Sequence, residues 1–325
     1  MALPEVHPQG GKISHPVSAL LPHLALLFAV MLLGLSFVGV RAIMADNEAP
    51  ATLGFLRYGL AVLILLPFLL GAKAKRQKLP LNVILIIILL GVLQFGLFHL
   101  FINTALEKIT ASRGAVIFAL IPIMTMLLAA ATGRDTLTSL KLFAAILSII
   151  GVAVAIGEKA FAPEAASKSW TGELLFFMAV CCGSIYNTFS SRLMQNRSVL
   201  LMTIIGMGAG TMAIFPVAYS EGLSSVLTGY TTKDWMWIFY LSGPAAAVSL
   251  LIFNWGLQQL SPSQTAIYVP IAPILAAAFG ALILNEHLSQ LFLVGLGCAV
   301  AGPILVNWRR RGGVNSPAPP ERPQN

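Results

Sequence analysis

Two arginines lie inside strongly apolar stretches of the sequence, where a charged side chain calls for a physical reason. Arg41 lies near the end of one apolar run, and Arg57 lies about two turns into the next. A guanidinium inside a bilayer is costly to insert, and its forked donors match a carboxylate or a phosphate. These residues predict a site for an anion or for the carboxylate of an amino acid. The alternative for both is that the side chain reaches the interface or ties helix ends together.

Three polar side chains in a later apolar run extend this candidate site. Gln94, His99 and Asn103 lie within one run, and positions 99 and 103 share a helix face because they are four residues apart. Asn103 is expected to make an interhelical hydrogen bond, since Asn254 repeats it later in the chain. His99 has Leu250 at the equivalent position, and this asymmetry favours a specific role for the histidine.

Five further residues are predicted to contact a substrate. Ser36, Tyr186 and Asn187 are polar groups in inner regions of their apolar runs, and Trp255 and Tyr268 are aromatic surfaces suited to an apolar side chain. For each of them, packing against lipid or the protein core is the alternative. The predicted substrate-binding set is Ser36, Arg41, Arg57, Gln94, His99, Tyr186, Asn187, Trp255 and Tyr268.

Three prolines are predicted to kink helices around a cavity. Pro122, Pro270 and Pro273 all fall within apolar runs, where a proline removes a helical hydrogen bond and clashes with the preceding turn. A fixed packing kink with no role in gating is the alternative. Asn103 and Asn254 complete the set of residues assigned to packing or kinks.

Carboxylates are confined to the ends of the apolar runs. Glu107, Asp135, Glu173 and Glu286 all have this position. Proton-coupled carriers commonly use carboxylates within the membrane as relays, so the pattern favours facilitated diffusion or exchange, or a relay that depends on His99. The sequence has no phosphate-binding loop, no cluster with metal-ligand spacing and no nucleophile with a matching base. We therefore expect no enzymatic activity, no metal and no cofactor.

Composition places the chain in the membrane. Of 325 residues, 57% are hydrophobic and 10% are charged, whereas a soluble domain carries about 25% charged residues. The apolar runs approach 20 residues, the length that crosses about 30 Å of hydrocarbon. The net charge is +8, and most of the basic residues lie outside the apolar runs, so membrane topology explains the charge better than nucleic-acid binding.

The runs predict an all-α integral membrane protein with ten transmembrane helices. Their expected ranges are 19–43, 51–71, 81–105, 111–132, 138–157, 171–194, 199–219, 234–258, 263–284 and 289–308. Residues 103–151 can be aligned with 254–302 without a gap, so that Asn103 meets Asn254 and Pro122 meets Pro273. Each half has an odd number of spans, which predicts two inverted five-helix repeats, an architecture of many secondary transporters.

Basic residues predict the orientation of these spans. With the N-terminus in the cytoplasm, 13 Lys and Arg fall on the cytoplasmic side and five on the other, and Arg41 and Arg57 lie within spans. The expected location is a bacterial inner membrane with both termini cytoplasmic. The predicted divisions are a cytoplasmic tail 1–18, a first repeat 19–157, an external linker 158–170, a second repeat 171–308, and a basic, then proline-rich, cytoplasmic tail 309–325.

Short motifs recur in order along both halves and carry a family resemblance. They are Leu33-Gly34-Leu35-Ser36-Phe37, Phe55-Leu56-Arg57-Tyr58, Asn103-Thr104-Ala105-Leu106 and Gly151-Val152, then Cys182-Gly183-Ser184, Asn254-Trp255-Gly256-Leu257 and Asn285-Glu286. From residue 20 to residue 308 the chain resembles a ten-helix member of the drug/metabolite transporter superfamily, of the EamA type. It departs from that pattern where Arg134-Asp135 and Asn285-Glu286 replace Gly-Glu, and where Leu33 replaces a tryptophan.

The resemblance implies a membrane transporter that moves small polar or amphipathic metabolites. Its substrates would often be amino acids, and the direction of transport would frequently be outward. The substrate would bind in a central cavity between the halves. The expected partners are a small-molecule substrate and membrane lipid, without nucleic acid, and the chain is expected to be a monomer or a homodimer. Alternatives are an uptake permease, an exporter of lipophilic drug-like compounds and, more distantly, a membrane receptor or scaffold that does not transport.

Overall fold

The computed structural model describes residues 16–71, 79–134, 136–157, 170–193, 198–259 and 268–310. Helices make up the regular structure of these residues, and no strand occurs among them. A helix is the expected form of an apolar chain in a bilayer, because its backbone N–H and C=O groups are hydrogen-bonded within one segment. Both predicted tails and the predicted linker fall almost entirely outside the described residues, as does the start of the ninth predicted span, 263–267.

The helices follow the order of the predicted runs. In the first half they are α1 (Pro16–Met44), α2 (Pro50–Gly71), α3 (Leu81–Gly91), the π-helical turn η1 (Val92–Leu97), α4 (Phe98–Lys108), α5 (Ala111–Phe118), α6 (Ile121–Ala131) and α7 (Ser139–Gly157). In the second half they are α8 (Thr171–Leu193), α9 (Val199–Ser220), α10 (Leu223–Gly229), α11 (Thr232–Ser242), the π-helical turn η4 (Gly243–Val248), α12 (Ser249–Gln259), α14 (Ile271–Leu284) and α15 (Gln290–Arg310).

Eight helical segments among the described residues are long and apolar enough to cross a membrane. They are Leu20–Met44, Pro50–Leu69, Leu81–Lys108, Ala111–Ala131, Ser139–Gly157, Thr171–Ser190, Val199–Ser220 and Thr232–Phe253. Shorter apolar stretches, Ile271–Leu284 and Gln290–Leu305, occupy the regions of the ninth and tenth predicted spans. The fold is therefore an all-helical one with eight candidate membrane helices.

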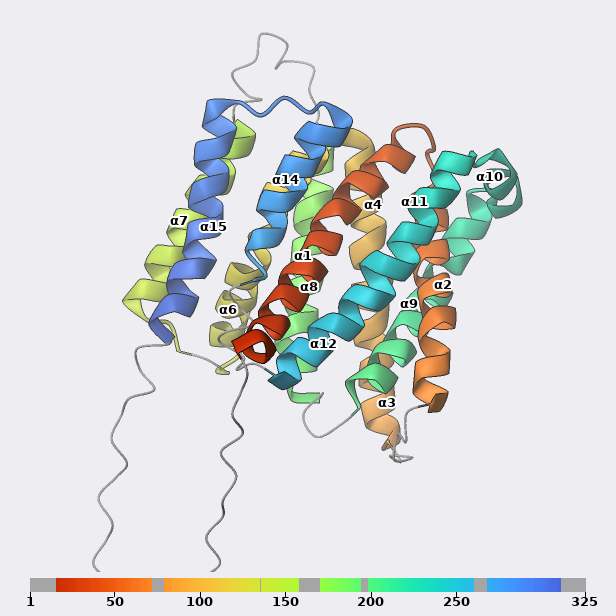
Figure 1. Cartoon of the computed structure of the whole chain (residues 1–325), viewed down its shortest axis with the longest axis horizontal. Coiled ribbons are helices and arrows are strands. Elements are labelled where there is room, and N and C mark those ends of the chain that lie inside the picture. The colour runs from red at the N-terminus through yellow and green to blue at the C-terminus, as the bar shows by residue number, and fades with distance from the viewer. Residues whose placement is uncertain are drawn as a thin grey trace, which may run out of the picture.

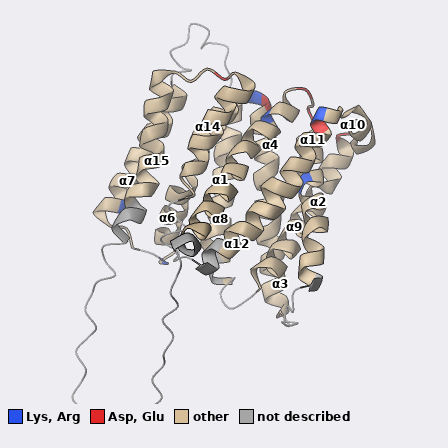
Figure 2. Ribbon diagram, viewed as in Figure 1, with Lys and Arg blue, Asp and Glu red and all other residues tan. Residues whose placement is uncertain are grey.

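The long helices pack side by side in one bundle (Figure 1). Helix α1 packs against α14 and α12, α2 packs against α9, and α4 packs against α8. The start of α1 and the end of α15 lie at the same end of the bundle (Figure 1). The acidic and basic residues lie mostly near the ends of the helices, and few charged residues occur in the middle of the bundle (Figure 2). This distribution is that of a membrane-spanning bundle.

The fourth predicted span is interrupted rather than continuous. The sequence predicts one helix over 111–132, but α5 ends at Phe118 and α6 begins at Ile121. Pro122 explains the break, because it has no N–H and its ring clashes with the carbonyl four residues earlier. It takes a position in the first turn of α6, where the missing donor is not needed.

Helices α7 and α15 form the most closely packed pair of the bundle, and glycine makes the contact possible. A Cβ on Gly295 would lie 2.6 Å from the carbonyl oxygen of Gly151. The Ser148 hydroxyl donates to the Ala299 carbonyl across the same contact (3.0 Å). Small residues at a membrane-helix contact let the backbones approach in this way.

Candidate functional site

A cavity of about 370 Å³ lies inside the bundle, between the first-half and second-half helices. Its walls come from α1, α2, η1, α4, α8, α9, η4 and α12, together with residues at the α5–α6 break and before α14. The lining residues are Ala29, Val30, Leu33, Arg57, Tyr58, Gln94, Phe95, Phe98, His99, Phe118, Ile121, Gly183, Asn187, Met207, Ala245, Ala246, Ser249, Leu250, Phe253 and Val269. Its volume is that of a pocket for a small organic molecule.

Arg57 is a buried cation that faces this cavity. Its side chain is 5% exposed, and it makes no hydrogen bond or ion pair with any described residue. Its nearest aromatic contact is the ring of Tyr58, whose centroid is 5.4 Å from the guanidinium carbon. A buried charge without a partner is costly, so a ligand with an anionic group would stabilise this arrangement.

Tyr58, His99 and the π-helical turn η1 form a connected polar chain beside Arg57. The His99 Nδ1 lies 2.9 Å from the backbone carbonyl oxygen of Gln94. A carbonyl only accepts, so Nδ1 carries the proton, and in the neutral ring Nε2 accepts from the Tyr58 hydroxyl. Both nitrogens of His99 are therefore occupied by the protein, and the ring supports the cavity wall.

Other polar groups of the cavity remain available to a ligand. The side-chain oxygen of Gln94 is buried and has no hydrogen-bond partner in the described part of the chain. Asn187 on α8 also lines the cavity. Of the nine predicted substrate-binding residues, the structure thus brings Arg57, Gln94, His99 and Asn187 together around one space.

Ser36 lies in a small hollow of about 30 Å³ that shares Arg57 and His99 with the main cavity. Its hydroxyl donates to the Leu33 carbonyl one turn earlier on α1 (2.6 Å). This bond occupies the hydroxyl proton, although the oxygen can still accept. Ser36 is therefore close to the site without lining the larger space.

Three predicted aromatic residues lie outside the lining of the main cavity. The Tyr186 ring packs edge-on against Phe95, with 6.0 Å between centroids, and so supports a wall residue from behind. Trp255 is exposed on α12. The Tyr268 hydroxyl pairs with Nδ1 of His23 (2.6 Å), which joins the segment before α14 to α1. A direct contact between any of these three residues and a substrate stays a prediction.

Arg41 and Asn103 tie helix ends together. Arg41 donates from one Nη to the carbonyls of Leu106 (2.6 Å) and Glu107 (2.9 Å) at the end of α4, where cations are favourable. Asn103 donates to the Pro50 carbonyl (2.9 Å) at the start of α2. The side chain of Asn254, its counterpart, lies outside the described residues.

The three predicted kink prolines meet around one small hollow. Pro122, Pro270 and Pro273 line it together with Phe118 and Val269, which also line the main cavity. Pro270 is the N-cap of α14 and Pro273 is its third residue, so both mark the beginning of that helix. Whether these positions move during function stays a prediction.

Two carboxylates cap the starts of helices from a distant part of the chain. Glu286 accepts from the N–H of Ala111 (2.6 Å), from the N–H of Ser112 (2.8 Å) and from the Ser112 hydroxyl at the start of α5. Glu221 accepts from the N–H of Ala51 (2.9 Å), the N–H of Thr52 (2.7 Å) and the Thr52 hydroxyl (2.8 Å) at the start of α2. Both arrangements complement the positive end of a helix.

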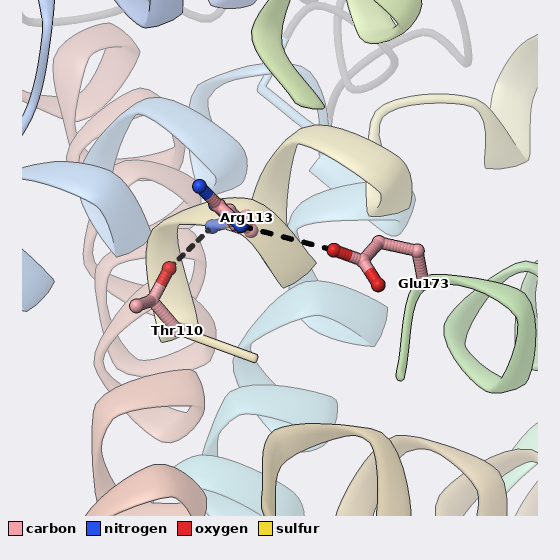
Figure 3. Close-up of polar contacts among 3 residues, drawn as sticks. All are labelled: Thr110, Arg113 and Glu173. Atoms are coloured by element: carbon pink, nitrogen blue, oxygen red, sulfur yellow. Dashed lines mark hydrogen bonds and ion pairs between the residues drawn. The ribbon is translucent and has the colours of Figure 1, made fainter. Parts of the chain in front are cut away.

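The start of α5 is also tied to α8. A side-chain nitrogen of Arg113 lies 3.8 Å from a carboxylate oxygen of Glu173 in the first turn of α8 (Figure 3). The backbone N–H of Arg113 donates to the hydroxyl of Thr110. Together with Arg41, Glu221 and Glu286, these contacts gather polar ties at the end of the bundle where α1 ends and α2 begins.

The sequence did not single out several residues that build the site. Tyr58 was included only as the last residue of the motif Phe55-Leu56-Arg57-Tyr58, without a role of its own. The cavity walls also contain Phe95, Ala245 and Ala246, whose side chains carry no distinctive chemistry. When the repeat alignment is extended upstream of residue 103, Phe95 is paired with Ala246.

An apolar helical bundle with eight candidate membrane helices among the described residues defines an integral membrane protein. The chain belongs to the EamA-like transporter family, which matches residues 20–157 and again residues 170–308. It is therefore a membrane transporter by family.

Curated relatives are similar over most of their length. An uncharacterized transporter of Bacillus subtilis (strain 168), YyaM, is 24% identical over 251 residues, covering 75% of this chain and 82% of the relative. An uncharacterized transporter of Archaeoglobus fulgidus is 22% identical over 290 residues, covering 88% and 99%. A probable terminal-alkyne amino-acid exporter of Streptantibioticus cattleyicolor is 23% identical over 246 residues, covering 75% and 78%.

A solved crystal structure shares the fold. It matches with a TM-score of 0.60 and 16% sequence identity, covering 93% of this chain and 100% of its own. At this identity the likeness concerns the architecture alone.

Proposed function

We propose that the chain is a secondary transporter for small carboxylate-bearing solutes, with amino acids as the leading class. Arg57 carries this proposal, because it is buried, faces the cavity and has no anionic partner among the described residues. Its planar guanidinium can bind a carboxylate through two parallel hydrogen bonds. A substrate carboxylate would supply the anionic partner that Arg57 lacks among the described residues.

A second group in the cavity suits the other end of an amino acid. The Gln94 side-chain oxygen is a buried acceptor without a partner, and Arg57 Nε is a buried donor without one. The ammonium group of an amino acid can donate to the Gln94 oxygen, and its carboxylate can accept from Arg57 Nε. The amino-acid exporter among the relatives also supports amino acids as the substrate class and export as the direction.

We further propose that transport proceeds by alternating access between two inverted five-helix halves. The element boundaries support this, since α3, η1 and α4 begin at residues 81, 92 and 98, and α11, η4 and α12 begin at 232, 243 and 249. Each pair differs by 151 positions, the same offset as the sequence repeat. Ten crossings would also place both chain ends on one side, and the excess of basic residues supports the cytoplasm as that side.

Export of lipophilic drug-like compounds is a second candidate. The aromatic side chains of Phe95, Phe98, Phe118 and Phe253 in the cavity favour it. A lipophilic cation would be repelled by the charge of Arg57, so this alternative applies to neutral compounds. Dependence on Arg57 separates it from the leading proposal.

Transport from proteoliposomes loaded with radiolabelled amino acids and monocarboxylates tests the proposal. Wild type is compared with Arg57→Ala and Arg57→Lys, and with Lys108→Ala, which removes an exposed cation that does not line the cavity. We expect Arg57→Ala to lose at least tenfold in rate, Arg57→Lys to retain part of it, and Lys108→Ala to transport normally. Equal transport by folded Arg57→Ala would make Arg57 structural and remove the basis of the carboxylate assignment.

A further inference from the structure

The two repeats present chemically different surfaces to the same cavity. Their π-helical turns begin at Val92 and Gly243, which fixes a one-to-one correspondence between the surrounding positions. Gln94 corresponds to Ala245, Phe95 to Ala246 and His99 to Leu250, and all six residues line the cavity. The backbone repeats, but polar or large side chains in the first half face small or aliphatic side chains in the second.

The first-half wall holds the groups that recognise a charged head. The Nε of Arg57 and the side-chain oxygen of Gln94 have no hydrogen-bond partner among the described residues, whereas His99 is held by Tyr58 and by the Gln94 carbonyl. Because Arg57 is 95% buried from solvent and lines the cavity, its position fixes where an anionic group binds. The polar end of a substrate therefore lies against α2 and η1.

The second-half wall carries smaller side chains at its π-helical turn. Ala245 and Ala246 occupy the positions where the first half has Gln94 and Phe95, and both line the cavity. The part of the cavity over these two alanines is called the recess below. Leu250 and Phe253 on α12 border it, and no described lining residue of η4 or α12 is charged. An apolar group of a ligand can be buried there.

We propose that substrates bind across the cavity in one orientation, with the carboxylate at Arg57 and an apolar side chain in the recess over Ala245 and Ala246. These two alanines then determine specificity, and the preferred substrates are amphipathic monocarboxylates such as amino acids with aliphatic or aromatic side chains. A second carboxylate would have to be buried against an apolar wall, so dicarboxylates bind poorly. This inference rests on the proposed carboxylate transport and adds the shape of the substrate.

Binding affinities of amino acids with side chains of increasing size test whether the recess takes up an apolar side chain. Purified protein is tested for binding of radiolabelled leucine, with unlabelled alanine, valine, phenylalanine and glutamate as competitors. Each buried methylene contributes roughly fourfold in affinity. We therefore expect leucine to bind at least tenfold more tightly than alanine, and glutamate to compete least.

Filling the recess provides the matched test. Ala246→Phe restores the residue found at the equivalent first-half position, and it should weaken leucine and phenylalanine at least tenfold but alanine less than twofold. Val248→Phe adds the same ring to the same turn on an exposed face, where Val248 is 38% exposed, and should change none of the affinities. Ala246→Val, a smaller change, should weaken phenylalanine about threefold and gives the same reading if the larger variant does not fold.

The outcomes separate this inference from the function on which it rests. If alanine and leucine bind equally, or if Ala246→Phe weakens every competitor alike, the recess is refuted while binding that needs Arg57 keeps the carboxylate proposal. If wild type binds none of the carboxylates, the proposed function fails and the recess fails with it.

Discussion

Loss of the Glu286 carboxylate is expected to destabilise the protein, because this one side chain satisfies three donors at the start of α5. The distances from its oxygens to the N–H groups of Ala111 and Ser112 are 2.6 and 2.8 Å, and the Ser112 hydroxyl is the third donor. A side-chain cap contributes about 1 kcal/mol. A negative charge at the positive end of a helix adds about 0.5–1 kcal/mol in a partly exposed position. Since α5 also packs against α8 and α14, destabilising its first turn also weakens the packing of α5 against these two helices.

We expect Glu286→Ala to lower the free energy of unfolding by about 2–3 kcal/mol, counting the unmet donors. At about 2 °C per kcal/mol for a large chain, the melting temperature falls by roughly 5 °C. Glu286→Gln keeps one acceptor oxygen and should lose about half as much. Thermal unfolding in detergent, followed through the fluorescence of the five tryptophans, measures these shifts.

Glu48→Ala is the control, because it removes an exposed carboxylate between α1 and α2 that makes no hydrogen bond to a described residue. Its melting temperature should stay within about 1 °C of wild type. The capping argument is wrong if Glu286→Ala melts no lower than Glu48→Ala. It is also wrong if the glutamine variant is as unstable as the alanine variant, since the remaining amide oxygen should preserve part of the cap.

Other substitutions test packing and buried hydroxyl groups in the same unfolding assay. Gly295→Ala should cost about 1–3 kcal/mol, because its Cβ would lie 2.5 Å from the Ala155 nitrogen, whereas Gly297→Ala, with nothing within 4 Å, should be neutral or slightly stabilising. Equal melting temperatures for these two variants would contradict the packing of α7 against α15. Tyr240→Phe should cost about 1 kcal/mol, because it removes a 2.7 Å hydrogen bond to a backbone carbonyl of α1. Tyr230→Phe should be neutral or stabilising, since the Tyr230 hydroxyl is buried without a partner in the described residues and burial raises its pKa; a loss comparable to Tyr240→Phe would reveal a missing contact.

The membrane segments were predictable because their signal is local. The expected span 51–71 is α2 (Pro50–Gly71), and the expected span 138–157 is α7 (Ser139–Gly157). A run of apolar residues records directly that the segment is surrounded by lipid or protein. The interruption at residues 119–120 was not predicted, although Pro122 was recognised, because hydropathy does not distinguish a kinked helix from a broken one.

The polar contacts of the site depend on pairs that sequence spacing does not reveal. Gln94 and His99 are close in the chain, and the structure places both in the lining of the same cavity. The bond between Tyr58 and His99 joins two different helices, and the cap from Glu286 to Ser112 joins residues 174 positions apart. The sequence placed Glu286 at the end of an apolar run, and its hydrogen bonds show that it caps the start of another helix.

The distribution of close contacts constrains how the proposed halves could rock. The polar ties made by Arg41, Glu221 and Glu286 lie near helix ends, where water can replace each hydrogen bond as it breaks. The contact between α7 and α15 is of the opposite kind, because Gly151 and Gly295 bring backbone against backbone and no solvent exchange compensates their separation. In the proposed mechanism α7 belongs to the first half and α15 to the second, so this pair must remain together while the polar end opens. In the proposed mechanism, alternating access would then turn about the α7–α15 contact.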